Sequence, residues 1–168
     1  MSVEIKKAKI KNGIFLSYEY VEKTSDTENK ISTSSDTPIH EDLRDAFQAL
    51  VPHFGLLTEE FSTFSNDEET RNKFKVTGFT IGGSGDTEGI VISGHKKLES
   101  GKVVNFNTPF TKFDEENYEH IDELNQAVEH LKQEVFEYIE GKQAQRSETG
   151  TFDFPEDEEA FTMETENE

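Results

Sequence analysis

Basic and aromatic side chains alternate within residues 73–113, a pattern typical of single-stranded nucleic-acid binding. Lys73, Lys75 and Phe79 are separated by even numbers of residues in one predicted strand, so we expect all three on the same side of it. Lys102 and Phe106 have the same relation in a later predicted strand. Aromatic rings stack on bases while lysines pair with phosphates, and each stacked base contributes about 1–3 kcal/mol. The candidate nucleic-acid-binding residues are Lys73, Lys75, Phe79, Lys96, Lys97, Lys102 and Phe106.

The same residues also have a purely structural interpretation. Lysines on edge strands discourage pairing between the sheets of different molecules. Phenylalanines, for their part, lie mostly in protein cores. Phe79 and Phe106 therefore face either outward with the lysines or inward beneath a helix, and the sequence leaves both orientations open.

Residues suited to catalysis or metal binding form no recognisable motif. The histidines make neither a His-Glu-x-x-His pattern nor a di-iron Glu-x-x-His pair. The chain has no cysteine, which excludes disulfides and thiol catalysis. The glycine-rich segment 82–89 lacks the Gly-Lys-Ser/Thr of a phosphate-binding loop. We therefore expect a protein that is not an enzyme, with no catalytic residue, cofactor or metal.

The chain is strongly acidic, but its charge is unevenly distributed. Its 168 residues carry a formal net charge of -19, which disfavours affinity of the whole molecule for nucleic acid or anionic membranes. Residues 1–23 and 71–113 nevertheless contain twelve basic and six acidic residues together. Residues 114–141, in contrast, contain ten acidic residues and a single lysine. The predicted strands therefore form a basic region within an acidic protein.

Apolar alternation predicts five strands. Two of them flank Asn12-Gly13, a dipeptide that favours a tight hairpin because both residues tolerate positive φ. The alternation shifts between Ile5 and Ala8, which indicates a bulge near Lys6. The other three strands form a meander across residues 73–113. Residues 24–35 are rich in Ser, Thr, Asp and Asn without an apolar pattern, and we expect a loop there.

Helical periodicity predicts one short and one long helix. Thr37-Pro38 supplies a hydroxyl cap and a first-turn proline for the short helix, and Pro52 ends it. Asp114 caps the long helix, and Gly141 ends it. Its apolar stripe either covers the sheet, which we favour, or forms the seam of a homodimer. The stripe consists of Ile121, Leu124, Val128, Leu131, Val135 and Tyr138.

The order of these elements predicts an α+β fold. About five mostly antiparallel strands, with an OB-like arrangement as one option, are expected to be covered by the two helices in a single domain of residues 1–143. The apolar pattern then stops, and we expect residues 144–168 to form a disordered acidic tail. Phe152, Phe154 and Phe161 are too sparse to build a core, and they are candidate partner-binding residues of this tail.

The sequence shows no signal for secretion or membrane insertion. The first residues lack the apolar centre of a signal peptide. No apolar run approaches the roughly 18 residues that a membrane helix needs. We therefore expect a cytoplasmic protein without a membrane partner.

A basic and aromatic β-rich region followed by an acidic, phenylalanine-containing segment resembles the organisation of bacterial and phage single-stranded DNA-binding proteins. The segment that carries the resemblance is Phe152-Asp-Phe-Pro-Glu-Asp-Glu-Glu-Ala-Phe161. Tails of that family usually end on their phenylalanine, whereas seven residues follow Phe161 here. The two predicted helices also do not fit a plain five-stranded OB barrel. The chain resembles small phage and prophage proteins as well.

Two hypotheses follow. In the first, the protein is a non-enzymatic single-stranded DNA-binding accessory protein of phage-type replication or recombination. Its acidic tail competes with DNA for the basic strands and recruits replication or recombination proteins. In the alternative, the protein is an acidic protein-interaction module or inhibitor that mimics a polyanion and binds no nucleic acid.

Overall fold

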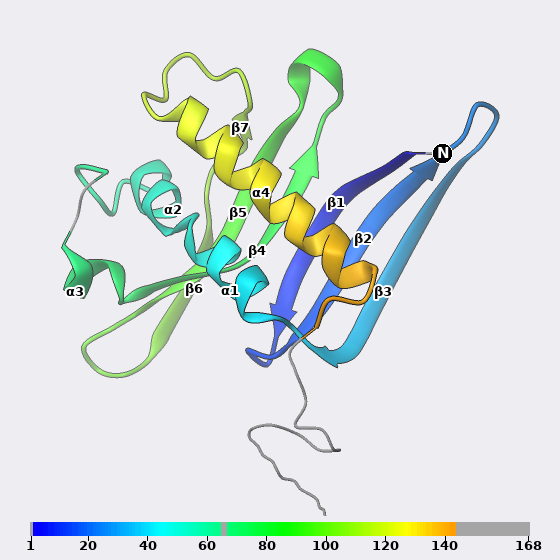
Figure 1. Ribbon diagram of the computed structural model, residues 1–168. Coiled ribbons are helices and arrows are strands. Elements are labelled where there is room, and N and C mark those ends of the chain that lie inside the picture. The colour runs from blue at the N-terminus through cyan, green and yellow to red at the C-terminus, as the bar shows by residue number, and fades with distance from the viewer. Residues whose placement is uncertain (1, 65–66, 144–168) are drawn as a thin grey trace, which may run out of the picture.

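Seven antiparallel strands form one open sheet in the computed structural model, which describes residues 2–64 and 67–143 (Figure 1). The strands are β1 (Ser2–Lys11), β2 (Phe15–Lys23), β3 (Glu28–Pro38), β4 (Phe74–Gly82), β5 (Gly89–Lys97), β6 (Val103–Asn107) and β7 (Thr111–Lys112). Their spatial order is β3-β2-β1-β4-β5-β6, and β7 also pairs with β5. The predicted α+β fold with antiparallel strands is confirmed. Seven strands replace the expected five, and the sheet does not close into a barrel.

The N-terminal hairpin forms as its sequence predicts. Asn12 and Gly13 both adopt positive φ, 55° and 73°, between β1 and β2. The predicted bulge is also present, because the register of β1 against β2 shifts between Ile5 and Lys7. The three strands of the predicted meander are β4, β5 and β6.

Strand β3 corrects the prediction of a loop over residues 24–35. Ser and Thr suit an edge strand, which has one neighbour and needs few apolar residues. The hydroxyl of Tyr138 donates to the carbonyl of Thr37 at 2.6 Å and lies 2.8 Å from Ser35 Oγ. Long-range polar bonds therefore hold this strand where an apolar stripe is lacking, and short-range sequence patterns do not reveal them.

Four α-helices accompany the sheet in the described part of the chain, and a 3₁₀ turn (Gly85–Thr87) connects β4 to β5. The α-helices are α1 (Glu41–Gln48), α2 (Val51–Leu57), α3 (Glu68–Arg71) and α4 (Ile121–Ile139). The predicted first helix corresponds to α1, which is capped by the ring of His40 rather than by Thr37. Pro52 does not end a helix as predicted but lies in the first turn of α2. Helix α4 begins at Ile121 rather than at Asp114, whereas Gly141 follows its end with φ of 117°, as predicted.

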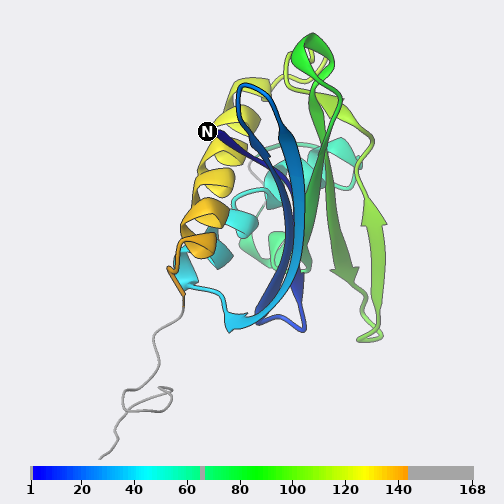
Figure 2. The same ribbon diagram turned by 90° about the vertical axis from the view of Figure 1, so that its right-hand side faces the viewer.

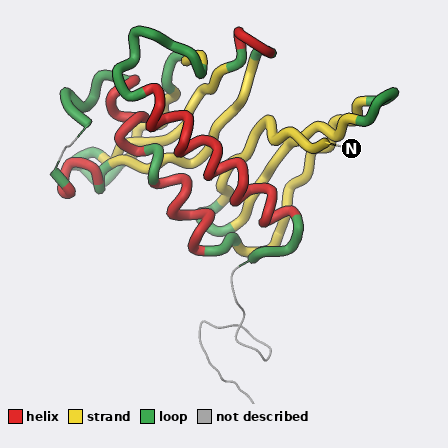
Figure 3. The backbone as a smooth tube through the Cα atoms, turned by 45° about the horizontal axis from the view of Figure 1, so that its top comes forward, coloured by secondary structure: helices red, strands yellow, loops and turns green. Residues whose placement is uncertain are grey.

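Helices α1, α2 and α4 all pack on one face of the sheet (Figures 1 and 3). The apolar stripe of α4 packs against the sheet and the other helices, since Leu124, Val128 and Leu131 are each at most 1% exposed. A second copy of the chain would meet the acidic outer surface of α4 instead. The stripe therefore offers no seam for a homodimer through this helix.

The opposite face of the sheet carries no helix in the described part of the chain, as the edge view shows (Figure 2). We call it the open face, and the other the covered face. None of the described helices is both long enough and apolar enough to cross a membrane.

Candidate nucleic-acid interface

Strand β1 presents Lys7 and Lys9 to the open face. After the bulge, Ala8 and Ile10 point into the core, so Lys7 and Lys9 between them point the other way and are exposed. Two residues on one side of a strand lie about 7 Å apart, roughly the spacing of neighbouring phosphates along a chain that follows them. The even spacing of these two lysines in the sequence was available as a signal, although they were not among the candidate site residues.

A bulge in β4 overturns the prediction that Lys75 and Phe79 share a side. The register of β4 against β5 shifts between Val76 and Gly78, so one extra residue reverses the alternation. Lys75 pairs with His95 on the open face. Phe79 lies in the core at 2% exposure, with its ring 6.2 Å from that of Phe47. Phe79 therefore has no surface on which a base could stack.

Phe106 also faces the helices. It lies opposite Gly94 on β5, and its ring stacks on that of Phe54 in α2 at 4.8 Å between centroids. A glycine suits position 94 because an added Cβ would come within 2.3 Å of the carbonyl oxygen of Lys75 and 3.0 Å of the ring of Phe54. The two candidate stacking residues are thus both on the covered face.

The remaining candidate lysines divide between the two faces. Lys75 and Lys97 are exposed on the open face, and Lys73 and Lys102 are exposed in the turns beside it. Lys96 points to the covered face, where its ammonium group lies 3.1 Å from Glu60 Oε1 and over the ring of Phe74. The structure therefore brings together four of the five candidate lysines near one end of β4, β5 and β6. The candidate tail residues Phe152, Phe154 and Phe161 lie outside the described residues.

A row of paired residues crosses all six strands of the open face. Lys9 pairs with Ser17 on one side and Gly78 on the other, and the row continues in both directions. In order from β3 to β6, it consists of Ser34, Ser17, Lys9, Gly78, Ser93 and Asn107. Because most of these side chains are small, they cover little of the sheet surface along this row.

The centre of the open face is hollowed, with a volume of about 460 Å³. We call this depression the hollow. Its polar side chains come from four strands and include Lys7, Lys9, Thr77, Thr80, Ser93, Asn105 and Asn107. Amides and hydroxyls supply donors and acceptors, and the two lysines supply positive charge. The hollow is thus chemically suited to an anionic, hydrogen-bonding ligand.

The lysines of the open face are less neutralised than those elsewhere. Within residues 2–64 and 67–143, no carboxylate forms an ion pair with Lys7, Lys9, Lys75 or Lys97. Burial, and then the nearby charge of Lys75, lowers the pKa of His95, so this ring adds no positive charge at neutral pH. The helix layer opposite exposes acidic residues, namely Glu41, Asp42, Asp45, Asp122, Glu123, Glu129 and Glu140.

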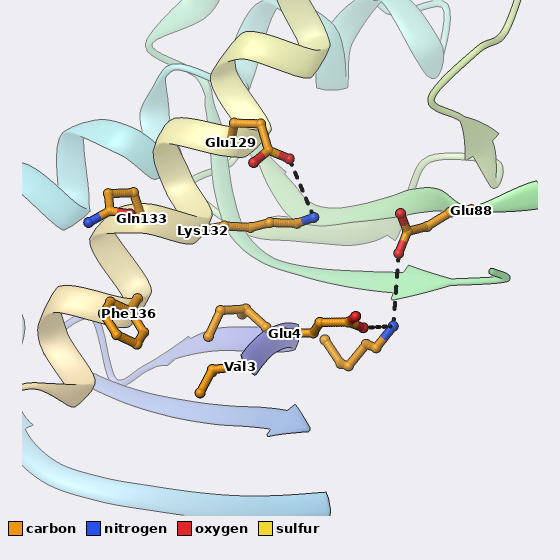
Figure 4. A pocket seen from close by; sticks show the side chains of 9 residues that line it. Val3, Glu4, Glu88, Glu129, Lys132, Gln133 and Phe136 are labelled. Atoms are coloured by element: carbon orange, nitrogen blue, oxygen red, sulfur yellow. Dashed lines mark ion pairs between the residues drawn. The ribbon is translucent and has the colours of Figure 1, made fainter. Parts of the chain in front are cut away.

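A second depression, of about 590 Å³, lies between α4 and the start of β1 (Figure 4). Its charges are mutually neutralised: Lys6 Nζ lies 3.3 Å from Glu4 and 3.9 Å from Glu88, and Lys132 Nζ lies 3.5 Å from Glu129 (Figure 4). A polyanion would have to displace these carboxylates. The depression under α4 is therefore a poorer anion site than the open face.

A buried pair of titratable residues lies within the helix layer. His53 is 2% exposed, and its Nδ1 lies 2.6 Å from the hydroxyl oxygen of Tyr118. Burial, assisted by His120, lowers the pKa of His53 to about 4, and burial raises the pKa of Tyr118. Both are thus neutral at physiological pH, and their contact ties α2 to the segment before α4.

Metal ligation has no support in residues 2–64 and 67–143, where no three His, Cys, Asp or Glu side chains gather around a common point. No protein-family model, curated protein or solved structure matches this chain. The arrangement of its own residues is therefore the basis for any functional inference.

Proposed function

We propose that the protein is a non-enzymatic, cytoplasmic accessory protein of phage-type DNA replication or recombination that binds single-stranded DNA on the open face of its sheet. The observation that supports this is the set of exposed lysines without carboxylate partners around the hollow. Lys7 and Lys9 contact phosphates at its centre, and Lys75 and Lys97 extend the track toward one end of β4 and β5.

The mode of binding is electrostatic rather than by stacking. Since Phe79 and Phe106 face the helices, neither of these two candidate rings can stack on a base at the open face. Affinity then depends on phosphate contacts, with Asn105, Asn107 and the hydroxyls of the hollow as further hydrogen-bonding partners. Binding is expected to be weak, little dependent on sequence and steeply dependent on salt.

Residues 144–168 act as an internal competitor in this proposal. From Phe152 onward they contain eight acidic residues and no basic ones. Tethering keeps such a segment at high effective concentration near the lysines. Phe152, Phe154 and Phe161 then serve to recruit replication or recombination proteins when DNA displaces the segment.

The test is fluorescence anisotropy of a labelled oligo-dT at low and high salt. Lys9→Gln is expected to weaken binding several-fold and to reduce the slope of log K against log salt by about 0.7, the value for one phosphate contact to a single strand. Lys132→Gln, on the covered face, removes the same charge and serves as the matched control. Equal losses of affinity in both variants would show that only the net charge of the protein governs binding. The open face would then not be the binding site.

The tail is tested separately with a chain that ends at Gly150. Its binding to oligo-dT should be tighter than that of the full chain, and the difference should shrink at high salt as screening weakens the competitor. The absence of binding by both chains at low salt would reject the proposal.

The acidic outer surface of the helix layer favours a second candidate function. In that alternative the helices engage a basic partner as a polyanion mimic, and the sheet is a scaffold. A labelled basic peptide such as polylysine would then bind the protein in the same anisotropy assay at low salt. The double substitution Glu123→Gln and Glu129→Gln would weaken this binding, whereas Lys9→Gln would not.

A further inference from the structure

Strand β6 lies at one edge of the sheet and exposes apolar side chains. Among the described elements it pairs only with β5. Val103 is 50% exposed and Val104 is 45% exposed, and Leu98, which precedes the turn into β6, is 38% exposed. Natural proteins usually protect such edges, because an exposed apolar strand is a template for another strand.

The backbone of β6 has a regular set of outward-facing groups. The hairpin closes with a hydrogen bond from Leu98 N–H to the carbonyl of Lys102 at 2.7 Å. Since antiparallel pairs alternate, Val104 and Phe106 use their backbone groups on β5. The N–H and C=O groups of Val103, Asn105 and Asn107 therefore point away from the sheet.

The two edges of the sheet differ in charge. Strand β6, Val-Val-Asn-Phe-Asn, has no charged residue and no proline. Strand β3, at the other edge, carries Glu28, Lys30 and Asp36 and ends at Pro38. Charges and prolines are features that block edge-to-edge pairing. In a chain with a net charge of -19, the uncharged β6 edge is the place where a second copy can approach without strong repulsion.

We propose that β6 pairs antiparallel with β6 of a second copy of this chain, about a two-fold axis that passes midway between the two Asn105 residues. This register uses all three outward-facing residues: Asn105 lies opposite its own counterpart, and Val103 lies opposite Asn107 of the second copy. On the covered face it also places Val104 opposite Phe106 of the second copy. The strand is thus self-complementary in both hydrogen bonding and apolar contact.

The symmetry has a consequence for the open face. An antiparallel pair of identical edge strands requires an axis perpendicular to the sheet, so the open faces of both copies lie on the same side. Asn105 and Asn107 line the hollow beside this edge, so the two hollows adjoin. The β1 strands then lie seven strand spacings apart, or about 34 Å. This consequence, unlike the pairing itself, rests on the proposed function: the dimer offers one continuous track for a single strand.

Cysteine cross-linking tests the pairing and its register in the full chain without nucleic acid, and the natural chain contributes no thiol. In Asn105→Cys, the two Cα atoms lie about 5.5 Å apart across the axis, within disulfide range. In Val103→Cys, the two positions are about 13 Å apart, beyond that range. We expect a dimer on a non-reducing gel after mild oxidation of Asn105→Cys but not of Val103→Cys. A mixture of Val103→Cys with Asn107→Cys should give the heterodimer.

The opposite pattern would overturn the proposal. If Asn105→Cys remains a monomer at high protein concentration, or if Val103→Cys cross-links as readily, then β6 does not pair in this way.

Sedimentation equilibrium gives a second readout. The apparent mass of the natural chain should rise with concentration from the 19.2 kDa of the monomer towards twice that value. Asn105→Pro removes only an outward-facing N–H, which an edge strand tolerates, and should keep the monomer mass at every concentration. Ser32→Pro, which removes an outward-facing N–H of edge strand β3, is the matched control and should still associate. A natural chain that stays monomeric throughout, or an Asn105→Pro variant that dimerises, would reject the pairing.

The two proposals fail separately. Val103→Pro also removes an outward-facing N–H of β6, at a residue that does not line the hollow. Loss of dimerisation in this variant with retained oligo-dT binding supports a dimer built from independently competent open faces, and the number of nucleotides covered per bound particle should fall by about half. Natural dimerisation without any oligo-dT binding would instead reject the proposed function and leave the β6 pairing intact.

Discussion

The two faces of the sheet are built from the same strands but carry side chains in different environments. On the covered face, Ile, Phe and Leu side chains from β1, β2, β4 and β5 meet α1, α2 and α4 with almost no exposure. On the open face, many of the alternate residues of these strands are lysine, serine and threonine, and β6 adds Asn105 and Asn107. Packing limits substitution on the first face, whereas solvent accepts many residues on the second. The proposed function would account for the basic composition of the open face.

The largest expected effect is in the core of the covered face. Phe79→Ala should lower the free energy of unfolding by about 3–5 kcal/mol, because it leaves a cavity between the sheet and the helices. Val91→Ala, a large-to-small change at a half-buried position of the open face, should cost about 1 kcal/mol or less. Urea denaturation measures both. Phe79→Leu should fold and keep its oligo-dT affinity; a folded Phe79→Leu protein without that affinity would restore a stacking role for Phe79.

The next effect concerns the buried ionisable group of the helix layer. The pKa of His53 is about 4 in the folded protein and about 6.5 in the unfolded chain. Between these values the unfolded state binds a proton that the folded state does not, so the free energy of unfolding decreases as the pH falls from 6.5 to 4, by at most about 3 kcal/mol.

Urea denaturation at several pH values in this window, compared between the natural chain and His53→Phe, isolates the contribution of His53. The variant should lose less stability on acidification, whatever its stability at pH 7. Identical pH slopes for the two proteins would show that His53 titrates normally and is not buried as described.

A smaller effect is expected where the covered face meets edge strand β3. Tyr138→Phe removes the hydroxyl that donates to the carbonyl of Thr37 at 2.6 Å. The expected cost is about 1–2 kcal/mol, because this carbonyl is left without its partner. Hydrogen exchange should show reduced protection in β3 and little change in β5. Equal loss of protection in both strands would indicate that Tyr138 supports the whole sheet rather than its edge.

The smallest effect on stability is expected on the open face itself. Lys9→Gln should change the free energy of unfolding by no more than about 0.5 kcal/mol, because the exposed Lys9 has no ion pair within the described residues. The same variant is expected to lose affinity for oligo-dT. A loss of stability above about 1 kcal/mol would mean that Lys9 serves the fold, and the contrast between the two faces would no longer hold.

Much of the fold followed from local patterns. Asn12-Gly13 predicted the first hairpin, and the three- and four-residue spacing of Leu124, Val128 and Leu131 predicted the buried side of α4. Strand β3 was missed because Ser and Thr without apolar alternation also describe a loop. Its position depends on backbone pairing with β2 and, at Ser35 and Thr37, on hydrogen bonds to Tyr138, more than a hundred residues later in the chain.

The candidate site was only partly predictable, and the two bulges show why. A single extra residue reverses the side of every residue that follows it in a strand. The bulge in β1 left a visible shift between Ile5 and Ala8, so it was predicted. The bulge in β4 falls at Thr77, between Val76 and Gly78, and it moved Phe79 away from Lys75 without a comparable signal.

The sequence by itself determined that the chain is acidic overall with a basic set of strands, that it combines helices with antiparallel strands, and that one side of its long helix is apolar. These properties depend on composition and on spacings within single elements. Only the tertiary structure decided that the sheet stays open, that Phe79 and Phe106 lie under the helices, and that Lys7, Lys9 and Lys75 share the open face. Those outcomes depend on strand register and strand order, which are fixed by contacts between residues far apart in the chain.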